Sequence, residues 1–69
     1  MPTIQTYEAR NIREGYRAYL GLHYGTVLHD PEPDGPGTVE ITIRCEYHPD
    51  EEEIFPVPAH SAVHAERSL

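Results

Sequence analysis

The chain has 69 residues, of which five are Arg, none is Lys, 12 are acidic and five are His, and its formal net charge at pH 7 is -7. This length allows one small domain, so we expect a single domain over residues 1–69. Clustered cations bind a phosphate backbone, and this acidic chain lacks them, so we do not expect nucleic acid as a partner.

The types of residue that are scarce or missing exclude several further classes of protein. Without Lys, the chain can form neither a Schiff base nor a P-loop. Cys45 is the only cysteine and cannot close an internal disulfide, which favours a reducing, cytoplasmic setting. There is no run of 18 apolar residues and no signal-peptide pattern, so we expect no membrane association. A core of this size rarely supplies more than about 3 to 5 kcal/mol, so we expect help from self-association, a metal or a partner.

The first 20 residues carry two conflicting patterns. Apolar residues recur at helical spacing between Ile12 and Leu20, but the same residues also alternate as in a strand. Gly15 lies inside the helical pattern, where it would cost a helix about 1 kcal/mol. We therefore predict a strand over residues 15–20, preceded by an N-terminal helix or an irregular arm over residues 1–11.

The middle of the chain has the pattern of strands joined by loops. Residues 23–29 end in a β-branched and apolar run, which predicts a strand, and Gly25 within it indicates a bulge or a close backbone approach. Residues 29–37 hold three Pro and two Gly, which predict a loop that connects a hairpin. The clearest pattern follows in residues 38–48, TVEITIRCEYH, where apolar and polar residues alternate and predict a strand with one buried face.

The last third of the chain begins with a charged turn over residues 48–53. Residues 54–58, IFPVP, form an apolar run in which Pro56 and Pro58 cannot donate backbone hydrogen bonds, so a strand here must lie at a sheet edge. The remaining residues suit one helical turn that leads into a short strand or a frayed end.

Taken together, these segments resemble a small Src-homology-3-like β-barrel of about five short strands, which implies an all-β fold. The resemblance rests on Gly15 to Leu20, Gly25 to Val27 and Val57 to Ser61. It covers residues 12–65 and leaves residues 66–69 as a tail. Because folds of this size host many functions, the resemblance predicts architecture rather than activity.

Two families share short strings with the chain. His23-Tyr24-Gly25 and Val57-Pro58-Ala59 resemble the Tudor-like, RNA-polymerase-interacting domain of CarD-type transcription regulators, which implies binding of another protein at a strand edge. Ile54-Phe55-Pro56 resembles the end of the type II dihydrofolate reductase barrel, which implies an oligomeric enzyme with its active site at the subunit interface. The chain lacks the Gln-Ile-Tyr active-site string of that second family.

One spacing suggests a metal site. Cys45, His48, His60 and His64 read as Cys-x2-His-x11-His-x3-His, which is close to the spacing of ligands that close a tetrahedral zinc site. Strand alternation opposes this set, because it places Cys45 and His48 on opposite faces unless the strand ends at Tyr47. We therefore expect no resident cofactor and keep zinc at these four residues as an alternative. A different mononuclear site that uses His23 and His29 with the others stays open as well.

Catalysis and partner binding are the other functional hypotheses. Cys45 would be a poor nucleophile because it points inward on a strand, so an enzyme is the less favoured class. The leading hypothesis is a non-enzymatic interaction module that binds another protein or a second copy of itself through an edge strand and surface tyrosines. The candidate partner-binding residues are Tyr24, Arg44, His48 and Phe55.

Overall fold

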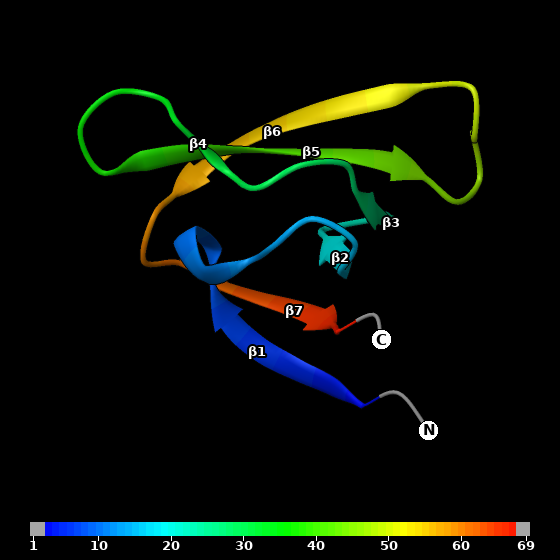
Figure 1. Cartoon of the computed structure of the whole chain (residues 1–69), viewed down its shortest axis with the longest axis horizontal. Helices are drawn as coiled ribbons and strands as arrows, with labels where there is room; N and C mark the ends of the chain where they lie inside the picture. Colours follow the sequence, from blue (N-terminus) through cyan, green and yellow to red (C-terminus); the bar gives the residue numbers. More distant parts are fainter. Residues whose placement is uncertain (1–2, 68–69) are drawn as a thin grey trace.

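The structure, a computed structural model, describes residues 3–67 and is all-β. One antiparallel sheet of seven strands curls into a half-barrel (Figure 1). The strands follow the order β1-β7-β2-β3-β5-β4, and β6 pairs with β5. Their bounds are β1 Ile4–Glu8, β2 Arg17–Leu20, β3 His23–Val27, β4 Glu32–Pro33, β5 Thr38–Cys45, β6 Glu52–Pro58 and β7 Ala62–Glu66.

The strand β5 is central to the sheet because it pairs with β3, β4 and β6. The predicted alternation is confirmed, since Val39, Ile41, Ile43 and Cys45 are all buried. The strand ends at Cys45 rather than at His48, because the chain turns there and the His48 amide donates to the Cys45 carbonyl at 3.2 Å.

The N-terminal segment differs from the expected helix or arm. Residues Ile4–Glu8 form β1, which pairs with β7 along its whole length, and only Ala9–Asn11 adopt a 3-10 helix, η1. This short turn places Ala9 and Ile12 in the core, where both are fully buried. A longer helix would also meet Gly15, whose φ of +90° does not fit a right-handed helix. The prediction of a strand over residues 15–20 is confirmed from Arg17 to Leu20, which form β2, whereas Gly15 lies in the turn before it.

Two additions raise the strand number from the expected five or so to seven. One is β1, in the segment expected to be an arm, and the other is β4, two residues of the predicted Pro/Gly loop that pair with β5. A turn after Pro58 leads into β7, which ends at Glu66. Of the predicted tail, residues 68–69 lie outside the described residues, as do residues 1–2 of the predicted arm.

Gly25 allows β3 and β5 to approach each other closely, as the sequence predicted. It pairs with Cys45 and is buried. A Cβ at this position would overlap the Arg44 carbonyl oxygen. It would also lie 2.7 Å from the Arg44 carbonyl carbon and 3.0 Å from the Cys45 Cα. No side chain larger than hydrogen fits there without separating the two strands.

The concave face of the half-barrel holds the core. It consists of small and β-branched side chains from the four strands β2, β3, β5 and β7, from η1 and from Ile12. Partly buried side chains pack at its margin, namely Tyr7, Tyr16, Leu20, Phe55, Val57 and Ala59. The strand β6 closes one edge of the sheet, because it pairs only with β5 among the described residues, so the predicted edge position of residues 54–58 is confirmed.

Paired tyrosines lie on the convex face of the sheet. Tyr19 and Tyr24 are cross-strand neighbours whose rings stack with centroids 4.3 Å apart, and the Tyr19 hydroxyl donates to Glu66 at 3.2 Å. Hydrogen bonding to Tyr24, burial and the nearby Glu66 together raise the pKa of Tyr19 from 10.0 to about 12.

We expect Tyr24→Phe to lower the pKa of Tyr19 toward 10.0, because the variant keeps the stacked ring and removes the hydroxyl with the largest influence. An NMR-detected alkaline titration of the Tyr19 ring measures this. Tyr47→Phe is the matched control, since Tyr47 is 75% exposed and should not affect Tyr19. A wild-type Tyr19 that titrates at its ordinary pKa would contradict the expectation.

Within residues 3–67, no helix is long and apolar enough to cross a membrane.

Candidate metal centre

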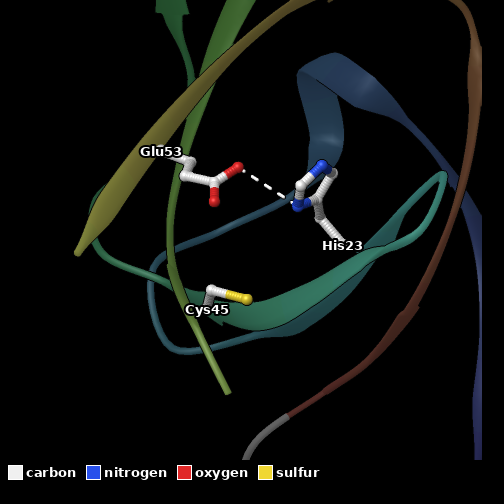
Figure 2. Close-up of side chains that lie close together, drawn as sticks. All are labelled: His23, Cys45 and Glu53. Carbon is white, nitrogen blue, oxygen red and sulfur yellow. Dashed lines mark ion pairs between the residues drawn. The ribbon is translucent and has the colours of Figure 1, made fainter. Parts of the chain in front are cut away.

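Three side chains of different donor chemistry meet at one end of the concave face. They are an imidazole, His23, at the start of β3, a thiol, Cys45, at the end of β5, and a carboxylate, Glu53, near the start of β6. One donor atom from each lies within 4.8 Å of a donor atom from both others. Figure 2 shows the three side chains reaching from separate strands toward a common space.

The register of the sheet explains this convergence. Gly25 pairs with Cys45, and Ile43 pairs with Glu53, so each pair shares one face of the sheet. His23 is two residues before Gly25 and therefore has the same side-chain direction, because successive residues of a strand alternate between faces. All three donors thus lie on the face that holds the buried Ile43.

Contacts to β6 hold the His23 ring in place. Its Nδ1 lies 3.1 Å from Glu53 Oε2, and its ring centroid lies 5.0 Å from that of Phe55. Cys45 forms the floor of the site at 3% exposure, whereas the His23 and Glu53 side chains are 44% and 28% exposed. The site is therefore closed on the thiol side and reachable from solvent on the other.

The distances suit a tetrahedral zinc ion. Zinc bonds of about 2.0 to 2.1 Å at the tetrahedral angle place a nitrogen and an oxygen ligand about 3.3 Å apart and a thiolate about 3.6 Å from either. His23 Nδ1 and Glu53 Oε2, at 3.1 Å, already have nearly that separation. The Cys45 sulfur lies within 4.8 Å of a ring nitrogen of His23 and of a carboxylate oxygen of Glu53. Each of these distances is therefore at most about 1.2 Å longer than a tetrahedral site requires.

The orientation of the imidazole argues against a thiol-based catalytic relay. Such a relay needs the carboxylate and the thiol at opposite ring nitrogens, so that one orients the ring and the other exchanges a proton. In Figure 2, the ring nitrogen that contacts Glu53 points toward the space between Glu53 and Cys45, and the second ring nitrogen points away from it. The arrangement therefore favours three donors that converge on one point.

The structure disperses the four residues of the predicted zinc spacing. Cys45 belongs to the cluster, but His48 is exposed in the turn after β5. The His60 ring contacts Glu8 at 2.7 Å, which is the main cause that lowers the pKa of Glu8, and His64 Nδ1 lies 3.1 Å from the Thr6 hydroxyl oxygen. Among the described residues, His23 and Glu53 are the ones that join Cys45.

The candidate partner-binding residues lie on different surfaces. Arg44 is exposed on the convex face, and Tyr24 lies on the same face with the Arg17 guanidinium 5.5 Å from its ring centroid. His48 is in the β5–β6 turn, and Phe55 is half-buried on the concave face beside His23. These four residues therefore do not form one continuous patch.

No protein-family model, curated protein or solved structure matches this chain. The resemblances to CarD-type regulators and to type II dihydrofolate reductase therefore stay hypotheses.

Proposed function

We propose that this protein binds a zinc ion through His23, Cys45 and Glu53. The observation that carries the proposal is the convergence of an imidazole, a thiol and a carboxylate from three strands within 4.8 Å. Thiolate and imidazole are preferred zinc ligands, and a carboxylate is an accepted third. Two of the three ligands are anionic when bound, so together they neutralise the charge of the ion.

The ion would connect strands that do not otherwise pair. Within the described residues, β3 and β6 both pair with β5 but not with each other, and the His23 contact to Glu53 spans that gap. Zinc at this position would hold the edge strand β6 against β3. Metal binding would then stabilise the curl of a sheet whose core is small.

Three protein ligands leave a fourth zinc position open. Sites with four protein ligands are structural, whereas three ligands plus water are typical of sites that bind an exchangeable ligand. The open position would face solvent, because His23 and Glu53 are partly exposed and Cys45 is not.

The test is the zinc affinity of matched variants, measured by titration calorimetry on untagged protein. Loss of a residue that only supports a metal ligand weakens metal binding by about 10- to 100-fold. Because Glu53 is proposed as a ligand itself, Glu53→Gln is expected to weaken zinc binding by more than about 100-fold. Glu52→Gln is its control, since Glu52 neighbours Glu53 but points to the opposite face. We expect that control to bind as wild type does.

A second comparison separates this site from the one predicted from spacing alone. The triple variant His48→Ala, His60→Ala, His64→Ala is expected to keep wild-type affinity and a stoichiometry of one ion per chain. If the triple variant loses zinc while His23→Ala retains it, the proposed ligand set is wrong.

We also propose that the half-barrel is Src-homology-3-like. This is supported by the order β2-β3-β5-β6 of antiparallel neighbours and by the return of β7 to pair with β2 after a short turn. In this proposal, β1 and β4 are additions to the shared architecture.

A further inference from the structure

The outer edge of β1 carries backbone groups that the sheet does not use. The Ala9 amide donates to the Ser61 carbonyl at 2.9 Å. Continuing this pattern back along β1, the odd-numbered residues direct their backbone amides and carbonyls toward β7. Backbone groups alternate along a strand, so the amides and carbonyls of Ile4, Thr6 and Glu8 point away from β7. Within the described residues, no other strand pairs with this edge.

The opposite edge of the sheet is less suited to pairing. Pro56 and Pro58 lie in β6 opposite Glu40 and Thr38, and neither has an amide hydrogen. Prolines in an edge strand belong at positions that face away from the neighbouring strand, so the free edge of β6 lacks donors at both residues. The edge of β1, from residue 4 to residue 8, contains no proline.

Charge is segregated away from β1. Residues 29–56 hold nine of the 12 acidic residues and one of the five Arg, which gives a net charge of -8 there and +1 over the rest of the chain. Figure 1 shows β1 and β7 at the bottom of the molecule and the β5–β6 hairpin at the top. Two chains that meet at β1 would therefore keep their acidic halves far apart.

We propose that β1 pairs with β1 of a second copy to form a two-fold dimer with a continuous sheet. An antiparallel pair centred on Thr6 places Ile4 opposite Glu8 of the other copy and Thr6 opposite Thr6. Each such pair exchanges two backbone hydrogen bonds, so the outward amides and carbonyls of all three residues are used. The half-exposed Ile4 side chain, at 51%, gains cover from the neighbouring strand.

The edges of the sheet together limit the assembly to two copies. A two-fold interface uses the same edge of both chains and leaves no second copy of that edge free. The β6 edge is poor in donors, and the remaining edge strand, β4, has two residues, of which Pro33 has no amide hydrogen. Further chains therefore do not add to the dimer by strand pairing. The proposal is independent of zinc, because β7 and β2 lie between β1 and the strands of the metal centre in the sheet (Figure 1).

The test is sedimentation equilibrium of the full chain with and without chelator. An interface of this size is weak, so we expect a mass that rises with concentration from 7.8 kDa toward twice that value, over roughly 10 µM to 1 mM. Thr6→Pro removes one outward amide and should hold the mass at that of one copy. Thr6→Val is the control, because it removes the hydroxyl near His64 but keeps the amide, and it should associate like wild type.

Hydrogen exchange on the wild-type chain tests the same interface without a proline. The amides of Ile4, Thr6 and Glu8 should exchange at least about 10-fold more slowly at the highest concentration than at the lowest, whereas those of Ile54 and Glu52 should not change. A wild-type mass of one copy up to about 1 mM overturns the proposal. Unchanged exchange at β1 in a chain that does associate also overturns it.

Discussion

Gly25→Ala should leave most of the protein unfolded at 25 °C. The added Cβ would overlap the Arg44 carbonyl oxygen and approach the Cys45 Cα to 3.0 Å, and both neighbours are backbone atoms of the central strand β5. Backbone cannot rotate away as a side chain can, so β3 would have to separate from β5. We expect a loss of about 3 kcal/mol or more, comparable with the whole stability of a domain this small.

The control is Gly21→Ala in the β2–β3 turn. Gly21 has a φ of +67°, but a Cβ there would meet no atom within 4 Å. The strain of a left-handed conformation alone costs about 1 to 2 kcal/mol. Urea denaturation followed by circular dichroism compares the variants, and equal destabilisation by both would show that close approach at Gly25 has no special role.

Zinc should raise the melting temperature by roughly 10 to 20 °C. A ligand that binds only the folded state stabilises it by about 2.7 kcal/mol when its free concentration is 100 times the Kd. For a domain of this length, each kcal/mol corresponds to roughly 4 to 8 °C. The gain arises because the ion joins β3 to β6, strands that share only the neighbour β5.

Calorimetric melting with zinc and then with excess chelator measures this gain. In Glu53→Gln, the zinc-dependent rise should nearly vanish, whereas Glu52→Gln should retain it. A chain whose melting temperature is the same in zinc and in chelator would contradict zinc binding to the folded state.

Much of the fold could be predicted from the sequence, because its signals are local. The alternation of Val39, Ile41 and Ile43 is a property of single strands, and Pro56 and Pro58 restrict their own strand to an edge whatever its neighbours are. The N-terminal strand β1 could not be predicted in this way. Its pairing with β7 joins residues about 58 positions apart, such as Thr6 and His64, and leaves no local pattern.

The candidate site shows the same limit. Cys45 was singled out for its donor chemistry, but spacing along the chain suggested His48 and two later histidines as its companions. The actual neighbours follow from register, since Gly25 opposite Cys45 places His23 on the same face, and Ile43 opposite Glu53 adds the carboxylate. Glu53 belongs to the acidic run that the sequence pattern assigns to a charged turn over residues 48–53. Alternation with Phe55 and Val57 was the signal that could have identified it as inward-facing.

A zinc-edge anomalous diffraction map of crystals grown with one equivalent of zinc tests the central proposal most directly. Zinc bound by these three residues should give one strong peak at about 2.0 to 2.3 Å from His23 Nδ1, Cys45 Sγ and a Glu53 carboxylate oxygen. A peak at His48, His60 or His64, or none at the three converging donors, would contradict it.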